Sequence, residues 1–400
     1  MLGSVFIRRA AMFAVAVVQF ASLNVFGATK QTVVTMHTNS LKITELEKIA
    51  PPYAAFMWAL ANEAGYQSLK NSNHPDLSYG AAFSRVLAQI KPSQTQVAEG
   101  WLDLNKLSAS EKQAVLDAQS IATRIYNDFS QSLAAAEAPM GSEWPTAPGR
   151  GLWRPTPPAM AKPALPNWGK MGLFSGAKVE ELTKDLIPPA LGSTDFVAEL
   201  DEVLRLGGVN STERTADQTE IAKFWVGGAG TVTPPGLWIR IGLQRLQEVP
   251  VNFTEAVLAM RTLSYALCDA GIAAWQVKYL HQTWRPITAI HEDLADTTWQ
   301  PLLTTPPFPG YVSGHSTFSS AAATVLGSIL PLTGERLKVT SPDLPGVVRT
   351  FASYEEAALE AGKSRIYGGI HVEADNRDGI LLGERVGCAL IEKMYGHRCN

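Results

Sequence analysis

Apolar residues recur at helical spacing along most of this 400-residue chain, and that periodicity limits the possible fold more than any other feature. Signals for strands are scarce, and only Gln31–Met36 could be a short strand or an extended arm. Because 46% of the residues are hydrophobic, the chain can bury a large core. We therefore predict an all-α fold, a helical bundle. The predicted helices are Tyr53–Ala64, Ala81–Ile90, Ser108–Ala136, Asp195–Leu206, Ala216–Trp225, Leu237–Gln247, Phe253–Trp284, Ser316–Leu330, Tyr354–Ala361 and His371–Met394.

Two of these helices begin at recognisable capping residues. Ser108 stands three residues before Glu111, which is the pattern of a capping box. Asn252 can cap the long helix that follows it. Both starts are therefore expected close to these positions.

One stretch, residues 139–193, interrupts the helical pattern. It is rich in proline, glycine and tryptophan, as in Trp153–Gly169, and prolines at this density exclude a continuous helix. Tryptophans need burial, so we expect a long ordered loop packed on the helical body rather than a free linker. The loop is either functional or packing material, and the sequence leaves both readings open. It separates an N-terminal helical region at 28–138 from a second helical region at 194–400.

The first 27 residues, 1–27, have the composition of an export signal peptide. Arg8 and Arg9 precede the apolar run Ala10–Phe26, and Val25 and Gly27 supply small residues before a cleavage site. An uncleaved membrane anchor is the alternative, but the apolar run is short. The mature chain is then expected to be periplasmic or secreted, with no membrane attachment. Its net charge of −3, without a basic run, gives no indication of nucleic-acid binding.

The three cysteines show neither a CxxC motif nor zinc-type spacing. An exported chain can join Cys388 to Cys399 across a short C-terminal loop, or it can leave all three thiols free. Cys268 lies in an apolar helical run and is expected in the core.

Lys278 and Arg285 form the first of three clusters that can carry chemistry. They lie seven residues apart on a predicted helix, so both cations are expected on one face, about 10 Å apart. Pro286 ends or kinks the helix just after the arginine. A surface pair that serves only solubility would show the same pattern.

The second cluster is Ser313-Gly314-His315, at the start of a predicted helix. Free N–H groups and the helix dipole make such a start an anion site. Ser313 adds a hydroxyl donor, and His315 adds a group that can take up a proton near neutral pH. An ordinary helix cap with a histidine nearby would look the same.

The third cluster is Ser364-Arg365, followed by His371 and Asp375. Because His371 and Asp375 are four residues apart at a helix start, the carboxylate can reach the imidazole. That contact would fix one tautomer and make the other ring nitrogen a better ligand or nucleophile. Asp375 could equally be a helix-start charge with no further role.

Together the clusters supply three cations, one hydroxyl, at least one backbone N–H and two histidines. Arginine binds paired oxygens, lysine acts as a point charge, and histidine does covalent or proton work. The acidic residues of a magnesium-dependent phosphate site are missing from these motifs. The inventory predicts a pocket for a tetrahedral or trigonal-bipyramidal oxyanion.

The order of these motifs resembles the signature shared by vanadium-dependent haloperoxidases and type 2 phosphatidic acid phosphatases. The matching blocks are Lys278-x6-Arg285-Pro286, Ser313-Gly314-His315 and Ser364-Arg365-x5-His371. They lie in about a quarter of the chain, and Trp153–Gly169 is similar to a segment of bacterial haloperoxidase-like proteins. The resemblance implies the helical bundle of this superfamily, with residues 194–400 as its catalytic region. One departure is Val312, where the family usually has proline; its loss should loosen the turn without removing a ligand.

The resemblance also implies vanadate as the cofactor and a role for each matching residue. The oxygens outside the axial position would be bound by Lys278, Arg285, Ser313, Gly314 and Arg365. His371 would be the axial ligand to vanadium, and His315 would be the general acid–base.

Two aromatic residues bear on the choice of substrate. Trp275 lies three residues before Lys278 and Phe308 seven before His315, and both match aromatic positions near the halide in chloroperoxidase members. A hydrophobic wall there would desolvate a halide. The alternative is that both rings are ordinary core residues.

We predict an exported vanadium-dependent haloperoxidase that oxidises halide with hydrogen peroxide to hypohalous acid, which an organic acceptor consumes. The alternative is an exported, vanadate-inhibited acid phosphatase without a cofactor. In that enzyme His371 would accept the phosphoryl group of a phosphomonoester, and His315 would protonate the leaving group. A non-catalytic oxyanion-binding protein is a third reading, although binding alone needs neither histidine.

Overall fold

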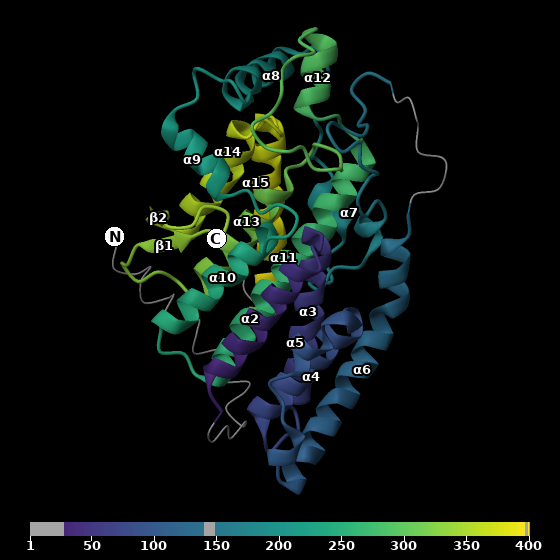
Figure 1. Ribbon diagram of the computed structural model, residues 1–400, viewed down its shortest axis with the longest axis vertical. Coiled ribbons are helices and arrows are strands. Elements are labelled where there is room, and N and C mark those ends of the chain that lie inside the picture. The colour runs from purple at the N-terminus through teal and green to yellow at the C-terminus, as the bar shows by residue number, and fades with distance from the viewer. Residues whose placement is uncertain (1–27, 140–148, 397–398, 400) are drawn as a thin grey trace.

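The computed structural model describes residues 28–139, 149–396 and 399, and these residues form an almost wholly helical molecule (Figure 1). The predicted all-α fold is confirmed. The described helices are α2 (Lys30–Leu46), α3 (Pro51–Ser68), α4 (Pro75–Ile90), α5 (Thr95–Glu99), α6 (Ala109–Glu137), α7 (Val179–Thr183), α8 (Thr194–Gly207), α9 (Ala216–Phe224), α10 (Thr233–Glu248), α11 (Phe253–His281), α12 (Pro286–Asp293), α13 (Gly314–Ile329), α14 (Tyr354–Tyr367) and α15 (Glu373–Tyr395). Short 3-10 helices occur at Pro92–Gln94, Leu104–Lys106 and Trp168–Lys170.

Helix α11 is the central element of the fold. It contacts α3 on one side and α13 and α15 on the other, and Figure 1 shows it between the two groups of helices. The predicted cap is present, because Asn252 and Glu255 exchange hydrogen bonds at its first turn. Among the described helices, α11 alone is long and apolar enough to cross a membrane, but 89% of that stretch is buried inside the fold. A helix that is apolar on all sides is typical of a protein core.

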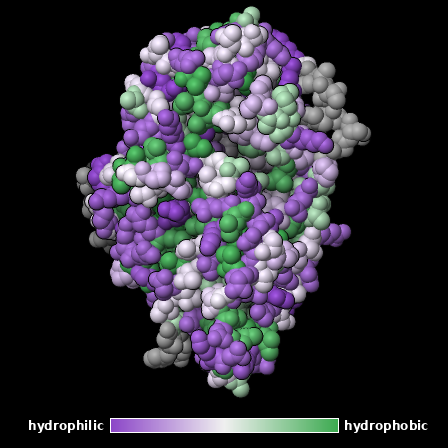
Figure 2. All heavy atoms as spheres, viewed as in Figure 1, coloured by the Kyte–Doolittle hydropathy of each residue, from purple (hydrophilic) through white to green (hydrophobic). Residues whose placement is uncertain are grey.

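Two groups of helices pack around α11. Helices α3, α4 and α6, with α2 beside them, form the N-terminal group, and α10, α13, α14 and α15 form the C-terminal group (Figure 1). Apolar side chains from both groups join in one hydrophobic core. On the face drawn in Figure 2, the remaining hydrophobic residues lie in several separate groups among hydrophilic ones. The three predicted clusters all belong to the C-terminal half, where α11, α13, α14 and α15 meet.

The prediction for Gln31–Met36 is wrong, since this segment lies inside helix α2. Val33 and Met36 are buried in the main core, and α2 packs against α4 and α11. Burial against neighbouring helices outweighs the weak strand preference of the local residues. The described strands form one short antiparallel hairpin, β1 (Leu337–Thr340) with β2 (Val348–Phe351), which the sequence did not predict.

The described part of the proline-rich loop, residues 149–193, packs on the helical body as expected. Trp153 and Trp168 are buried. Asp269 of α11 accepts hydrogen bonds from the backbone N–H groups of Phe174 at 2.7 Å and Ser175 at 2.9 Å. These two bonds fasten the loop to the central helix.

Two features bear on the compartment of the protein. Cys388 and Cys399 are joined by a disulfide, which was one of the two possibilities left open, and Cys268 is free and buried as expected. The predicted export signal at residues 1–27 lies outside the described residues.

Candidate functional site

The three predicted clusters meet at the junction of α11, α12, α13, α14 and α15. Lys278 lies in the last turn of α11, and Arg285 is the residue that precedes α12. His315 lies in the first turn of α13, Arg365 in the last turn of α14, and His371 two residues before α15. The spatial convergence on which the functional prediction depends is therefore present.

Lys278 and Arg285 do not share a helix face, so that part of the prediction is wrong. Helix α11 ends before Gln282, which adopts a left-handed conformation with φ 51° and turns the chain. Pro286 then begins the new helix α12 instead of kinking the old one, as proline commonly does at a first helical position. The two cations approach the site from different elements.

Lys278 holds the turn that leads into Ser313. Its Nζ donates to the carbonyl oxygens of Pro309 at 2.9 Å, Gly310 at 2.9 Å and Val312 at 2.6 Å. An ammonium group has three donors, and all three are used here. Lys278 therefore fixes the turn that Val312 was expected to loosen. Burial and the charge of Arg285 lower the pKa of Lys278 well below its usual range, and the charge of Asp375 opposes this shift.

The imidazole of His371 lies between a carboxylate and a guanidinium. Its Nδ1 is 2.7 Å from Oδ2 of Asp375, and its Nε2 is 2.9 Å from Nη1 of Arg285. Arginine can only donate, so the lone pair must be on Nε2 and the proton on Nδ1. The predicted contact between His371 and Asp375 is present, and it leaves Nε2 as the basic nitrogen.

His315 and Arg365 share a set of backbone acceptors. Nε2 of His315 lies 3.0 Å from the carbonyl oxygen of Trp225 and 3.1 Å from that of Val226. Nη1 of Arg365 lies 2.9 Å from the same imidazole nitrogen and donates to Trp225 O at 2.7 Å. Since Nε2 faces carbonyl acceptors and a guanidinium donor, it can hold a proton in one state and accept a hydrogen bond in the other. That duality suits a group that transfers protons.

Ser313 and Gly314 lie at the N-terminus of α13, as predicted. Oγ of Ser313 accepts from the N–H of Ser316 at 3.3 Å and caps the helix, while the Ser313 N–H donates to Asp375 O at 2.8 Å. A Cβ placed on Gly314 would lie 3.5 Å from the ring of Trp275. The helix start is therefore positioned against the indole.

Buried cations outnumber the ionised carboxylates near them. Lys278, Arg285 and Arg365 are each at most 2% exposed. The carboxylates whose charges act on these cations are Asp375 and Asp343, and burial raises the pKa of both, to about 7 for Asp375. Uncompensated buried charge is strongly unfavourable, so the site calls for an anion.

Two guanidinium nitrogens of this cluster also lack acceptors within the described part of the chain. They are Nη2 of Arg285 and Nε of Arg365, both fully buried. A buried donor without a partner costs about 1–3 kcal/mol. An oxyanion with several negative oxygens would accept from both groups and supply the missing charge, so the residues present fit vanadate and phosphate alike.

Burial also sets the protonation of the two histidines. It lowers the pKa of His371 well below its usual range, and the nearby charges of Arg285, Lys278 and Arg365 lower it further. Burial and the charge of Arg365 lower the pKa of His315 in the same way. Both imidazoles are therefore neutral at pH 7 before an anion binds.

Trp275 and Phe308 form an aromatic pair beside the cations. Their ring centroids are 4.9 Å apart, and Trp275 is only 1% exposed. Nζ of Lys278 lies 5.1 Å from the Phe308 ring centroid, and the Arg285 guanidinium carbon lies 5.0 Å from it. The pair therefore lies beside the cluster as well as in the core, and its role toward a halide stays a prediction.

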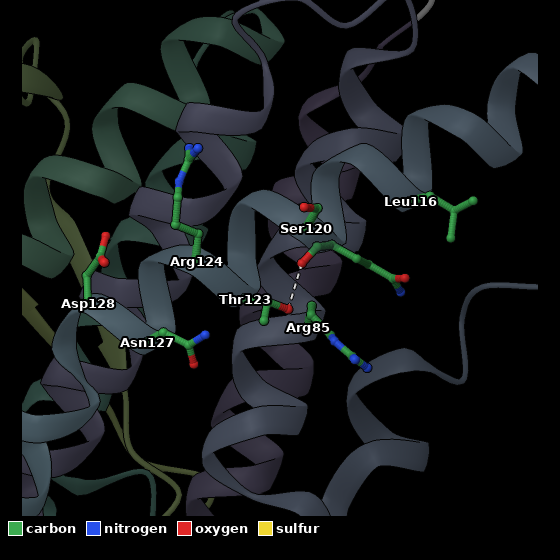
Figure 3. Close-up of a pocket in the computed structure, with 8 residues that line it drawn as sticks. Arg85, Leu116, Ser120, Thr123, Arg124, Asn127 and Asp128 are labelled. Carbon is green, nitrogen blue, oxygen red and sulfur yellow. Dashed lines mark hydrogen bonds between the residues drawn. The ribbon is translucent and has the colours of Figure 1, made fainter.

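A separate hollow is lined by Arg85 of α4 and by residues of α6 (Figure 3). Arg85 of α4 faces polar side chains of α6 there, and the bond drawn joins Thr123 to the Gln119 carbonyl oxygen. None of the predicted site residues lines it. The imidazole of His281 contacts Leu186 O at 3.0 Å and packs edge-on against the ring of Tyr311, and among the described residues it makes no hydrogen bond to a predicted site residue.

The sequence did not reveal the backbone acceptors that orient the cations. Arg285 donates to Phe308 O and Ile370 O, both at 2.8 Å, and Arg365 donates to Trp225 O. Carbonyl groups are present at every residue, so no residue type could have marked these positions.

The chain is similar in sequence to a protein family and to one characterised enzyme. Residues 259–398 match the family described as the VCPO second helical-bundle domain. Vanadium chloroperoxidase from Curvularia inaequalis is 28% identical in an alignment of 279 positions that covers 52% of this chain and 46% of that enzyme. The match thus spans about half the length of the curated relative.

Solved structures show the same fold. A bacterial vanadium-dependent iodoperoxidase superposes with a TM-score of 0.80 at 24% identity, over 92% of this chain and 97% of that one. A holo-type bacterial vanadium-dependent chloroperoxidase superposes with a TM-score of 0.69 at 14% identity, over 87% of this chain and 92% of that one. At these identities the likeness establishes the architecture.

Proposed function

We propose that this chain, whose residues 259–398 belong to the VCPO second helical-bundle domain family, is an exported vanadate-dependent haloperoxidase. It would oxidise a halide with hydrogen peroxide to hypohalous acid. The observation that carries the proposal is the buried excess of positive charge around His371, together with the unpaired N–H groups of Arg285 and Arg365.

The donors present divide into two sets. Arg285 and Arg365 offer their unpaired N–H groups to the oxyanion, and the α13 N-terminus at Ser313 and Gly314 offers its dipole. The donors of Lys278 hold the preceding turn instead. When bound, vanadate would supply a Lewis acid that activates hydrogen peroxide toward a halide, and vanadium would keep its oxidation state.

His371 and His315 take different roles because their surroundings differ. Asp375 keeps the proton of His371 on Nδ1, so Nε2 is the atom available as a ligand. Nε2 of His315 lies between the Arg365 guanidinium and the Trp225 carbonyl, where it can hold or release a proton. We assign proton transfer to His315.

The aromatic pair favours the peroxidase over the phosphatase. Trp275 and Phe308 place hydrophobic surface directly beside Lys278 and Arg285. Such a surface excludes water and weakens the hydration of a small anion.

The alternative is a vanadate-inhibited acid phosphatase in which Nε2 of His371 attacks phosphorus. The same lone pair, fixed by Asp375, supports that chemistry equally well. The two activities therefore have to be separated by assay.

The test measures both activities on one preparation. The purified chain is loaded with orthovanadate and assayed for triiodide formation from iodide and for monochlorodimedone halogenation, each with hydrogen peroxide. The vanadate-free chain is assayed for p-nitrophenyl phosphate hydrolysis. We expect vanadate-dependent halide oxidation, lost in His371→Ala and retained in His281→Ala, whose imidazole contacts Leu186 O instead. Phosphate hydrolysis without halide oxidation would favour the alternative.

Export is a separate part of the proposal. It is supported by the basic and apolar pattern of residues 1–27 and by the Cys388–Cys399 disulfide, since disulfides persist in oxidising compartments. N-terminal sequencing of the protein from an expressing bacterium should find a start near Ala28. Full-length protein recovered from the cytoplasm would contradict it.

A further inference from the structure

A second cavity lies directly behind the aromatic pair. It has a volume of about 500 Å³ and separates the outer face of α11 from residues 166–180 of the proline-rich loop. Trp275 lines it and also contacts Phe308 and Lys278 on the side of the oxyanion cluster. One indole therefore separates the cavity from the proposed catalytic centre. Other lining residues are Met171, Leu173, Val179, Gln276 and Tyr279.

The loop wall of this cavity is fixed to α11. A Cβ on Gly169 would meet the backbone nitrogen of Gln276 at 2.3 Å, so the two segments touch backbone to backbone. Trp168 is fully buried beside them, and Asp269 holds the backbone of Phe174 and Ser175. A cavity of this size with preformed walls is typical of a small-molecule site.

The Gln276 side chain leaves one polar atom unused at the cavity. Its Nε2 donates to Oε1 of Glu180 at 3.1 Å. A carboxylate can only accept, so this contact fixes the amide orientation. Oε1 of Gln276 is then buried, and no donor reaches it within the described part of the chain. A ligand with a hydroxyl or N–H group would satisfy it.

The remaining walls indicate what the ligand should look like. Met171, Leu173 and the edges of Trp275 and Tyr279 offer apolar and aromatic surface, which suits an aromatic ring. Lys170 and Lys178 line the cavity with exposed side chains. The amide of Gln276 leaves the Glu180 carboxylate charged, and Nζ of Lys178 lies 3.8 Å from Oε1 of Glu181, so Lys170 is the lysine that favours an anionic substituent.

We propose that this cavity binds the organic acceptor of the reaction, a small hydroxylated aromatic carboxylate. The role of this ligand as an acceptor depends on the haloperoxidase function proposed above, whereas the binding of the ligand to the cavity does not. The halogen of hypohalous acid is transferred as an electrophile to a ring carbon, the C–H bond is lost, and the released proton joins hydroxide to form water. Hydrogen peroxide, already a substrate, supplies the oxidising equivalents.

Binding is tested without vanadate, halide or peroxide, by titration calorimetry with 4-hydroxybenzoate, benzoate and phenol. Wild type should bind 4-hydroxybenzoate most tightly, because benzoate lacks the hydroxyl group and phenol the carboxylate. Gln276→Leu should raise the dissociation constant of 4-hydroxybenzoate roughly tenfold and leave that of benzoate unchanged. Gly172→Phe should abolish binding, because a Cβ at Gly172 meets open space in the cavity lining.

Gly149→Phe is the matched control, since it adds the same side chain in open space outside the cavity. Unchanged binding in Gly172→Phe, or no heat from 4-hydroxybenzoate at millimolar concentration, would overturn the proposal. Triiodide formation by Gly172→Phe should equal that of wild type. Because the binding and triiodide assays are independent, failure of the cavity proposal and failure of the haloperoxidase proposal give different results.

Discussion

Nδ1 of His371 lies 2.7 Å from Oδ2 of Asp375, and both side chains are buried. Arg285 approaches the opposite nitrogen at 2.9 Å, so the ring is held from both sides in one orientation. The carboxylate comes from the first turn of α15 and the guanidinium from the start of α12. The four-residue spacing of His371 and Asp375 thus keeps the proton on Nδ1, and helix packing brings Arg285 to the lone pair on Nε2.

Replacing Asp375 by asparagine should weaken vanadate binding. Asparagine cannot balance the neighbouring cations and can present its amide N–H₂ to Nδ1, which would move the proton to Nε2. Loss of such an orienting partner reduces metal affinity or activity by about 10–100-fold. Titration calorimetry with orthovanadate and the triiodide rate should both show the loss. Asp378→Asn is the control, because that carboxylate bonds Tyr311 and Arg377 instead; an equal effect in both variants would refute the orienting role.

Replacing Arg365 by methionine should abolish the stabilisation of the fold by orthovanadate. The stability of the vanadate-free protein should change little. In wild type, orthovanadate at one hundred times its dissociation constant should stabilise the fold by about 2.7 kcal/mol, seen as a rise in melting temperature. Arg365→Met should not show this rise. Without anion its melting temperature should stay close to that of wild type, because the lost bond to Trp225 O is offset by removal of an uncompensated charge.

Arg245 provides the contrast for this experiment. It is equally buried, but it has carboxylate partners in Glu248 at 3.3 Å and Glu335 at 3.4 Å. Arg245→Met should therefore lower the melting temperature and keep the full vanadate response. If Arg365→Met lowers the melting temperature of the vanadate-free protein as much as Arg245→Met does, the charge of Arg365 is not uncompensated in the fold.

The helices were predictable because their signals are local. Ser108 and Asn252 mark two helix starts that agree with the structure. The spacing of apolar residues located other helices less sharply, since the predicted ends differ by six residues at the start of α4 and at the end of α14. Helix α2 was missed because its stability comes from burial of Val33 and Met36 by distant helices. The predicted helix Phe253–Trp284 was too long at its C-terminal end, because the left-handed turn at Gln282 leaves no strong sequence signal.

The sequence predicted which side chains form the site, but not which backbone groups bind them. Arg365 and His371 belong to a recognisable motif, and the structure brings them together with Lys278. That Lys278 uses all of its donors on carbonyl groups of the preceding turn depends on backbone geometry, which the sequence does not encode residue by residue. The cavity beside Gln276 was invisible for the same reason.

Replacing Phe308 by alanine should affect chloride more than iodide. The ring lies against Lys278 and Arg285 and pairs with Trp275, so its loss admits water beside the cations. Chloride is the more strongly hydrated and less easily oxidised anion. We expect kcat/KM for chloride, or for bromide if chloride is not a substrate, to fall at least about tenfold, and iodide to change less than about threefold. Phe129→Ala, which removes a partly buried ring stacked on Phe174, should leave the halide ratio unchanged.

The stability of the fold should depend on pH through His37. Its imidazole is fully buried, with Nδ1 at 2.8 Å from Val33 O and Nε2 at 3.0 Å from Asn62, and burial lowers its pKa to about 4. Between about pH 6.5 and pH 4 the unfolded chain binds a proton that the folded chain does not, so His37 contributes stability above this window and loses it as pH falls. The loss is about 3 kcal/mol.

The raised pKa of Asp269 acts with the opposite sign over an overlapping range, because the folded chain holds a proton there that the unfolded chain has released. The effect of His37 must therefore be read as a difference between variants. Urea unfolding of wild type and His37→Gln at pH 7 and pH 4 isolates it. The variant should be less stable at pH 7, and the gap should narrow by about 3 kcal/mol at pH 4. A gap that stays constant between the two pH values would show that His37 is protonated in the folded chain or exposed to water.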